Sequence, residues 1–190
     1  MVRSHAVDAA PPVAAVALGL PARVSLYLEM SKPRLSLLAV ASAVVGYLLA
    51  GGEPGVPMLA LGVGSFLMSA GSSLLNQVLE REHDARMVRT RGRALPSGRI
   101  SPEEALGVGI LTGLTGAVLL AQLVHPLTAA LGVAVLTGYV LLYTPLKRRT
   151  SLNTFVGAVV GALPVAMGTV AAAGKAEEVG AALFAIQFLW

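Results

Sequence analysis

Three oxygen-bearing side chains stand four residues apart in one stretch of the chain: Asn76, Glu80 and Asp84. On an α-helix, residues at i and i+4 lie on the same face, about 6 Å apart along the axis. The spacing therefore predicts a ladder of one amide and two carboxylates. Oxygen ligands of this kind suit Mg²⁺, which proteins often bind through a few carboxylates together with the phosphates of a substrate.

A cluster of arginines surrounds the end of this ladder. Its members are Arg81, Arg86, Arg89, Arg91, Arg93 and Arg99. Guanidinium groups bind phosphate oxygens through paired hydrogen bonds, so the cluster and the ladder together indicate a site for Mg²⁺ and a phosphorylated ligand. Membrane topology alone also produces arginine-rich loops, and the acids can pair locally with Arg81 and Arg86. Polar groups such as Asn76 and Gln77 are costly at a membrane boundary, which favours the functional interpretation.

The composition indicates a membrane protein. Of the 190 residues, 55% are hydrophobic and 13% are charged, which is more apolar than a typical soluble domain. The absence of cysteine excludes disulfides and thiolate metal sites. The net charge is +4, but the basic residues lie between apolar runs, a pattern explained by membrane topology rather than by nucleic-acid binding.

The apolar segments predict an all-α bundle of membrane helices. Five complete spans are expected, at residues 35–52, 56–79, 105–124, 127–146 and 150–173. A sixth apolar segment, residues 179–190, is too short to cross a hydrocarbon core of about 30 Å, so we expect the chain to stop within a span. Residues 1–22 are rich in Ala, Pro and Val and predict a disordered tail. We expect residues 23–190 to form the membrane domain, beginning with an interfacial helix and incomplete at its C-terminal end.

The charges give the expected orientation. With this span count, every lysine and arginine except Lys175 falls on one side of the membrane, which the positive-inside rule makes cytoplasmic. Lys32 and Arg34 lie there, before the first span, and Lys147–Arg149 follow the fourth. In a closed bundle these last residues, with Asn153, can face the same cavity as Asp84. We therefore expect a multi-pass protein of the inner (plasma) membrane whose site faces the cytoplasm.

These residues resemble the intramembrane prenyltransferases of the UbiA superfamily, whose first motif is N-x-x-x-D-x-x-x-D. Asn76, Glu80 and Asp84 occupy its three positions, with Glu80 one methylene longer than the usual Asp. The stretches Arg89-Thr90-x-x-Arg93 and Leu95-Pro96-Ser97-Gly98-Arg99 also match, with Ala94 where Pro is usual.

The narrower match is to the protoheme IX farnesyltransferase branch of that superfamily. It rests on Lys32-Pro33-Arg34, on Asp84-Ala-x-Met87-x-Arg89-Thr90, on Tyr143-Thr144-x-x-Lys147-Arg148-Arg149-Thr150 with Asn153, and on Gly161-Ala162-x-Pro164 with Gly168. Members of this branch have nine spans and a second acidic motif after the sixth. The resemblance therefore implies a C-terminally truncated member that carries part of the site.

The resemblance implies transfer of farnesyl from farnesyl diphosphate to a vinyl group of haem B in the lipid bilayer, giving haem O and diphosphate without a protein nucleophile. It assigns Asn76, Glu80 and Asp84 to Mg²⁺ and diphosphate. It assigns diphosphate binding to Arg89, Arg93, Lys147 and Arg148, and substrate contacts to Lys32, Arg34 and Asn153. Without the second acidic cluster, we expect the 190-residue chain alone not to make haem O.

Other interpretations stay open. A related prenyltransferase acting on an aromatic or quinone precursor would share Asn76, Glu80 and Asp84 and differ in its acceptor. A transporter would use the acids as an ion site, but transport sites commonly lie near the middle of the membrane, whereas these polar groups gather at one face. An inactive membrane fragment or scaffold is a third alternative. A second acidic motif downstream would discriminate between these classes.

Overall fold

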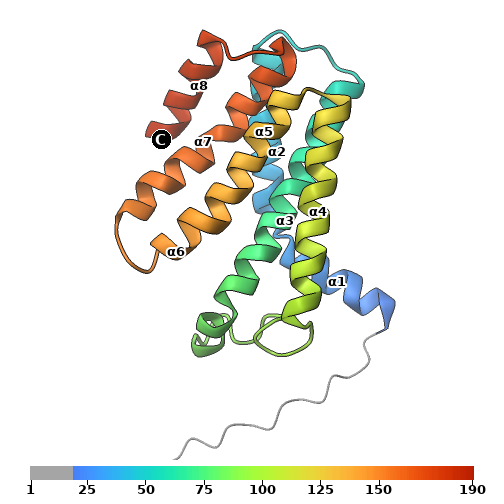
Figure 1. Ribbon diagram of the computed structural model, residues 1–190, viewed down its shortest axis with the longest axis vertical. Helices are drawn as coiled ribbons and strands as arrows, with labels where there is room; N and C mark the ends of the chain where they lie inside the picture. The colour runs from blue at the N-terminus through green and yellow to red at the C-terminus, as the bar shows by residue number, and fades with distance from the viewer. Residues whose placement is uncertain (1–18) are drawn as a thin grey trace, which may run out of the picture.

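The computed structural model describes residues 19–190, which form a bundle of helices (Figure 1). The elements are α1 (Leu20–Met30), α2 (Pro33–Leu49), α3 (Val56–Arg86), α4 (Pro102–Leu123), α5 (Pro126–Thr137), the π-helical segment η1 (Gly138–Tyr143), α6 (Thr144–Leu146), α7 (Leu152–Ala173) and α8 (Glu178–Leu189). No strand occurs within residues 19–190. Of the tail predicted for residues 1–22, residues 1–18 lie outside the described part of the chain. Its last three residues belong to α1, where Pro21 occupies the first turn, a position that favours proline.

The helices confirm a polytopic membrane bundle. Four are long and apolar enough to cross a membrane: α3, α4, the continuous stretch Pro126–Leu146, and α7. A fifth span arises if α1 and α2, which meet at a 54° bend, count as one. The expected first span therefore exists as α2, which with 17 residues is marginal on its own, and the expected sixth segment is the short apolar helix α8.

Glycines let the spans approach closely. A Cβ on Gly71 of α3 would lie 2.8 Å from the backbone oxygen of Gly109 in α4, and one on Gly168 of α7 would lie 1.8 Å from that of Ala43 in α2. Only residues without a side chain fit such crossings, which are common between membrane helices. These two contacts join α3 to α4 and α2 to α7.

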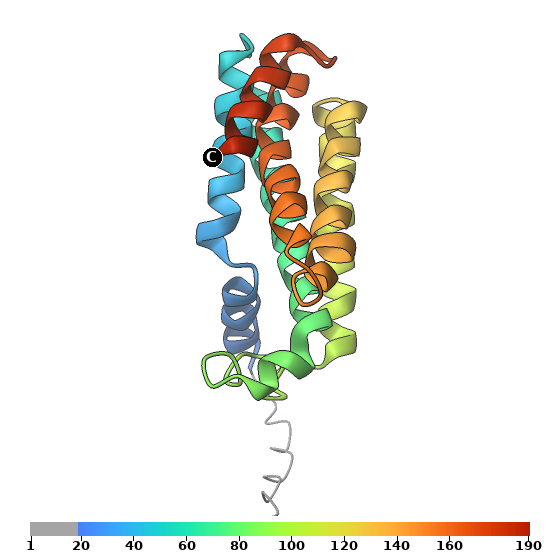
Figure 2. The same cartoon turned by 90° about the vertical axis from the view of Figure 1, so that its left-hand side faces the viewer.

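Helix α3 carries the ladder beyond the apolar part of the bundle. It has 31 residues, about 46 Å of helix, and continues to Arg86 where the apolar run ends at Leu79. Figure 2 shows α1 and the loop after α3 together at one end of the molecule, whereas α8 and the α2–α3 turn lie near the other end. The polar end of α3 is therefore surrounded by α1, by its own following loop and by the start of α4.

The loop after α3 is folded onto a small apolar core. Ala94, Leu95 and Ile100 of the loop are buried against Leu26 and Met30 of α1. At the end of the loop, the Ser101 hydroxyl accepts a hydrogen bond from the backbone N–H of Glu104 at 3.1 Å, a side-chain cap that starts α4. The arginine-rich segment is thus fixed at both ends, which gives its side chains defined positions.

Candidate active site

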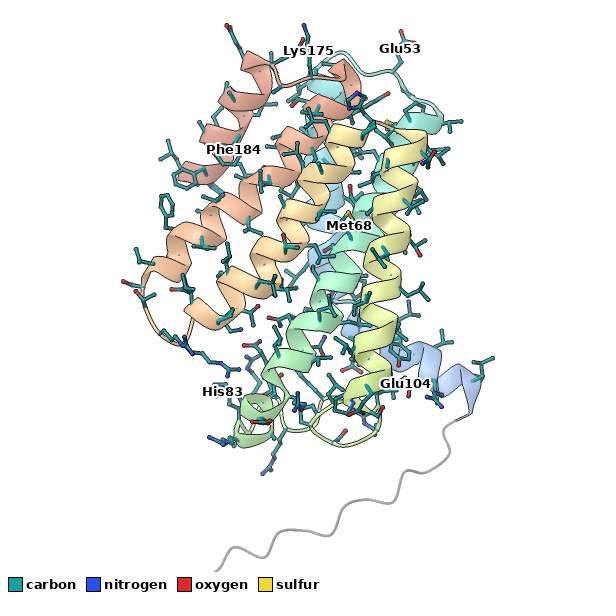
Figure 3. All side chains as sticks on the ribbon, in the orientation of Figure 1. Glu53, Met68, His83, Glu104, Lys175 and Phe184 are labelled. Carbon is teal, nitrogen blue, oxygen red and sulfur yellow. The ribbon has the colours of Figure 1, made fainter. Side chains whose placement is uncertain are left out.

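The three ladder residues are buried on α3. Asn76 is 1% exposed, and Glu80 and Asp84 are each 5% exposed. The Asn76 amide nitrogen donates a hydrogen bond to Oε2 of Glu80 at 3.1 Å, as residues one turn apart on the same face can do. His83, exposed at the same end of α3 (Figure 3), lies off this buried face. Two carboxylates held away from water need positive partners, because an unpaired buried charge is strongly unfavourable.

Three cations from two distant segments supply those partners. Lys147 Nζ lies 2.5 Å from Oε1 of Glu80, and Arg148 Nη2 lies 3.4 Å from the same oxygen. Arg93 Nη1 lies 2.7 Å from Oδ2 of Asp84. The side chains of the three cations are 29–39% exposed, whereas the side chains of Glu80 and Asp84, taken without their backbone, are only 7% exposed. The cations therefore lie between the buried acids and solvent, where an incoming anion can reach them.

The loop after α3 positions Arg93. The Thr90 hydroxyl donates a 2.9 Å hydrogen bond to the backbone oxygen of Asp84, and Thr90 is 1% exposed. The backbone N–H of Arg93 then donates to the carbonyl of Thr90 at 3.0 Å. This turn brings the loop back onto the end of α3, so that Arg93 faces the helix that carries Asp84.

A π-helical turn precedes Lys147. Helix α5 changes into η1 at Gly138, and α6 follows at Thr144. The Thr144 hydroxyl lies 2.8 Å from Oδ1 of Asn76 and 2.8 Å from the backbone oxygen of Tyr139, so these two acceptors share its proton. Thr144 is 3% exposed. Single π-turns inside α-helices occur frequently at functional sites. Here the π-helical turn leads into the segment that carries Thr144, which contacts Asn76, and Lys147, which contacts Glu80.

The remaining candidate residues lie around this cluster. Arg34 and Arg89 are exposed, and within residues 19–190 neither forms an ion pair. Asn153 is half-buried at the start of α7. Lys32 is partly buried at the bend between α1 and α2, with φ of 49°. Left-handed backbone costs roughly 1–2 kcal/mol outside glycine, so the surrounding structure holds Lys32 in place.

Hydrogen bonds also attach α1 to the site. The Gln77 amide nitrogen donates to the backbone oxygen of Met30 at 2.7 Å, directly before the bend. At the other side, Tyr27 donates a 2.7 Å hydrogen bond to Oε1 of Glu104, which also pairs with Arg23. Helix α1 is thus fixed to both α3 and α4, and this fixes the position of Lys32.

A cavity of about 700 Å³ begins beside the ladder and runs into the bundle. Lys32, Ser73 and Tyr139 line it near the charged end; Ser73 is less than one helical turn from Asn76. Apolar side chains of α2, α5 and α7 make up most of its wall. The hydroxyl of Ser69 donates to Ser36, and that of Ser72 to a backbone oxygen, so both are satisfied locally. The cavity can take a long apolar molecule whose polar end stays at the ladder.

The ladder fits Mg²⁺ as a partial ligand set. No group of three or more His, Cys, Asp or Glu residues within residues 19–190 could hold a metal by itself. Glu80 and Asp84 nevertheless offer two buried carboxylates one turn apart, and none of the described donors reaches Oδ1 of Asp84. Magnesium usually binds through one or two carboxylates, substrate phosphates and water, which matches this donor set.

Three residues of the cluster have roles that the sequence does not assign. Thr90 and Thr144 lie in stretches that resemble the family, and Gln77 is a polar residue at the membrane boundary, but nothing in the sequence indicates their hydrogen-bond partners. Their hydrogen bonds reach partners that are distant in sequence or lie in loop backbone. The helical period reveals the ladder in the sequence because the spacing of its residues is local. Contacts that depend on how helices cross cannot be found in this way.

Comparison with known proteins places the chain in a family. The sequence pattern described as "UbiA prenyltransferase family" matches residues 39–190. A protein named protoheme IX farnesyltransferase from an Anaeromyxobacter species is 45% identical, over 86% of this chain and 55% of its own length. One from Solibacter usitatus is 39% identical, over 86% of this chain and 60% of its own length. The protein named protoheme IX farnesyltransferase, mitochondrial, from Arabidopsis thaliana is 40% identical, over 86% of this chain and 39% of its own length.

The chain thus spans about half the length of the curated bacterial relatives it matches. No solved structure matches it significantly. The family match covers most of the chain and includes the ladder, the arginine-rich loop and the Lys147 segment. The chain belongs to the UbiA prenyltransferase family.

Proposed function

We propose that this chain provides the diphosphate-binding part of an enzyme that transfers the farnesyl group of farnesyl diphosphate to a vinyl group of haem B, giving haem O and diphosphate. One observation carries the proposal: the buried acids Glu80 and Asp84 meet Arg93, Lys147 and Arg148 beside an apolar cavity. The names of the relatives favour haem over other acceptors.

Glu80 and Asp84, with Asn76 beside them, would hold Mg²⁺ together with the diphosphate. The bound ion supplies positive charge that stabilises negative charge growing on the leaving group. Asn76 is held by Thr144 and itself donates to Glu80, so it orients the carboxylate. Since these contacts exist before any ligand arrives, the ladder is preorganised.

The three paired cations would receive the phosphate oxygens. Lys147, Arg148 and Arg93 each contact a carboxylate and remain partly exposed. On binding, they can turn part of their hydrogen bonding toward the diphosphate without leaving the site. Preorganised cations directed at developing charge are usually the largest single contribution to catalysis of this kind. Lys32, which lines the cavity, and Arg34, Arg89 and Asn153 would complete the proposed set of substrate contacts.

The cavity walls would hold the farnesyl chain and exclude water from the reacting carbon. As the carbon–oxygen bond breaks, its electron pair leaves with diphosphate. The terminal vinyl carbon of haem B then bonds to the farnesyl C1. Water adds its oxygen to the inner vinyl carbon and releases a proton to solvent or to the diphosphate. No side chain forms a covalent bond, so the chain's contribution is charge, position and shape.

The charge distribution supports a cytoplasmic site in a multi-pass membrane protein. Lys32, Arg34, the arginine-rich loop and Lys147–Arg149 all belong to the ladder end of the bundle. Lys175, Glu53 and Glu177 belong to the opposite end, where Figure 3 labels the first two. The positive-inside rule then orients the ladder end toward the cytoplasm of the inner membrane.

The test separates binding from turnover. In lipid nanodiscs, the chain should bind radiolabelled farnesyl diphosphate in a Mg²⁺-dependent way, and Glu80→Gln should weaken binding at least tenfold. Glu82→Gln is the matched control, because Glu82 lies on the same helix with a 78% exposed side chain away from the cluster. Turnover is measured on residues 1–190 joined to the remaining part of the Anaeromyxobacter relative, with haem B as acceptor and haem O detected by mass spectrometry. Equal binding by wild type and Glu80→Gln, or turnover of a quinone precursor but not haem B, would refute the proposal.

A further inference from the structure

The bend between α1 and α2, the two blue helices of Figure 2, interrupts the helical hydrogen bonds at a buried place. Met30 and Ser31, which lead into the bend, are 3% and 5% exposed. Pro33, which follows Lys32, has no N–H and disfavours a right-handed helix at the residue before it. Within residues 19–190, no backbone N–H donates to the Met30 oxygen. A buried carbonyl group needs a donor, so this oxygen depends on a side chain.

Gln77 of α3 supplies that donor. Its amide nitrogen donates to the Met30 oxygen at 2.7 Å and to the Ser73 oxygen, one turn back on α3, at 3.2 Å. Gln77 is 5% exposed. Because successive residues on a helix point about 100° apart, Asn76 can face the ladder while Gln77 faces α1. The bond to Met30 joins two helices, so it fixes the end of α1 relative to the helix that carries the ladder.

The bend places Lys32 between the cavity and the charged cluster. Lys32 lines the cavity, whereas the three cations that pair with the ladder acids do not. Its ammonium group lies close enough to the ladder for the charges of Glu80 and Asp84 to act on it. Within residues 19–190, however, Lys32 forms no ion pair. A partly buried positive charge without a carboxylate partner is suited to an incoming anion.

We infer that Gln77 is a positioning residue: its bond to the Met30 backbone holds Lys32 where the ammonium group contacts the diphosphate of the substrate from the cavity side. The inference rests on the proposed function, because it takes the ladder as the place where the diphosphate binds. Gln77 itself touches neither metal nor substrate. It acts through Lys32, whose left-handed backbone the bend must maintain. Without the Gln77 donor, the end of α1 can shift and carry Lys32 away from the ladder.

Amine labelling measures the position of Lys32 directly, because the chain has three lysines, Lys32, Lys147 and Lys175. The chain in nanodiscs is treated with an acetylating reagent, and the labelling rate at each lysine is measured by mass spectrometry. Mg²⁺ and inorganic diphosphate are added at about ten times the dissociation constant of each variant, where a bound ligand should slow labelling about tenfold. In wild type we expect this protection at Lys32 and Lys147, and none at Lys175 near the opposite end of the bundle.

Three variants test the role of Gln77. Gln77→Met keeps the length of the side chain and removes the donor, so protection of Lys32 should fall to about twofold or less while Lys147 stays about tenfold protected. Gln77→Asn keeps an amide but is one methylene shorter, so it should lose part of the protection of Lys32 with less risk to folding. Gln122→Met makes the same substitution at an exposed position near the end of α4, and it should keep the wild-type pattern.

A double-mutant cycle shows whether Gln77 acts through Lys32. Lys32→Met should weaken diphosphate binding about tenfold, which corresponds to one hydrogen bond to a charged group. Gln77→Met should weaken it by no more than that. The double variant should bind no worse than Lys32→Met alone, because Gln77 has nothing left to position. Additive losses would mean that Gln77 acts on binding by another route, and the inference would be wrong.

The outcomes separate this inference from the proposed function. Wild-type protection of Lys32 in Gln77→Met and Gln77→Asn would overturn the role of Gln77. Equal loss of protection at Lys32 and Lys147, or failure of both variants to fold, would also overturn it, since Gln77 would then be a structural residue. If diphosphate protects Lys147 but not Lys32 in wild type, the inference fails and the proposed function stands. If diphosphate protects neither, the proposed function fails.

Discussion

Replacing Asp84 by Asn removes one negative charge from the ladder and little else. In the wild-type chain, Nη1 of Arg93 lies 2.7 Å from Oδ2 of Asp84. The Asn side chain keeps the same size, and its amide oxygen can still accept a hydrogen bond from Arg93. After the change the bond still involves one charged group, Arg93, and bonds of that kind contribute about 1.5–3 kcal/mol, so only part of the pair's contribution is lost. Because the Arg93 side chain is 29% exposed and can be hydrated, we expect a stability loss of about 1 kcal/mol or less. The fold should therefore survive.

The effect on function should be much larger. The carboxylate is the group that would bind Mg²⁺, and an amide is a poor substitute for it. We expect Mg²⁺-dependent binding of diphosphate to weaken at least tenfold, about 1.4 kcal/mol. Prenyl transfer by the fused protein should fall 100-fold or more, about 2.7 kcal/mol of transition-state stabilisation. The assay is a Mg²⁺ titration of diphosphate binding, with thermal unfolding of the same samples as the measure of stability.

A double-mutant cycle decides how Asp84 acts. If Asp84 only holds Arg93 in place, then Asp84→Asn combined with Arg93→Gln should bind diphosphate no worse than Arg93→Gln alone. If Asp84 also binds the metal, the double variant should be weaker, and its Mg²⁺ dependence should be reduced. Wild-type Mg²⁺ dependence in Asp84→Asn would refute the metal role.

Four further results are expected. Glu80→Asp should keep at least a third of wild-type diphosphate affinity, since metal and water absorb one methylene; a loss as large as that of Glu80→Ala would contradict a simple carboxylate role. Thr144→Val should destabilise the protein by about 1–3 kcal/mol in thermal unfolding, because it leaves the buried Asn76 oxygen without its donor, and Thr144→Ser should restore stability. Gly168→Ala should prevent α2 and α7 from packing and lower the yield of folded protein, whereas Gly161→Ala, with open space around its Cβ, should not; equal yields would contradict the crossing. A cysteine at Ser97 should resist an impermeant reagent in intact cells, and labelling there would contradict the cytoplasmic orientation.

The features that could be predicted are those that sequence-local physics determines. The spacing of Asn76, Glu80 and Asp84 is fixed by the helical period, and α3 continues far enough to keep all three on one helix. Ser101 caps α4 through a hydrogen bond to the backbone of Glu104, which is only three residues further along the chain. Apolar length gives the spans, because a membrane demands about 20 apolar residues whatever the surrounding fold.

The features that could not be predicted depend on how segments meet. Nothing in the apolar run of residues 127–146 marks the π-helical turn at Gly138, since hydrophobic period alone does not distinguish it from α-helix. The left-handed backbone conformation of Lys32 results from the packing of α1 on α3 and α4, which is a tertiary effect. The bend between α1 and α2, at Lys32, explains why the number of spans is four or five: α2 alone is short, and α1 meets it at an angle.

The charges of the cluster explain why metal and diphosphate would bind together. Glu80 and Asp84 carry two negative charges, and Arg93, Lys147 and Arg148 carry three positive ones, so the cluster has a surplus of one positive charge. A diphosphate ester carries about three negative charges at neutral pH, given a second phosphate pKa near 6. The ligand alone would leave an excess of about two negative charges in a partly buried site, which is unfavourable. A single divalent cation offsets that excess. We therefore expect diphosphate and Mg²⁺ each to raise the affinity for the other, by the same factor in both directions.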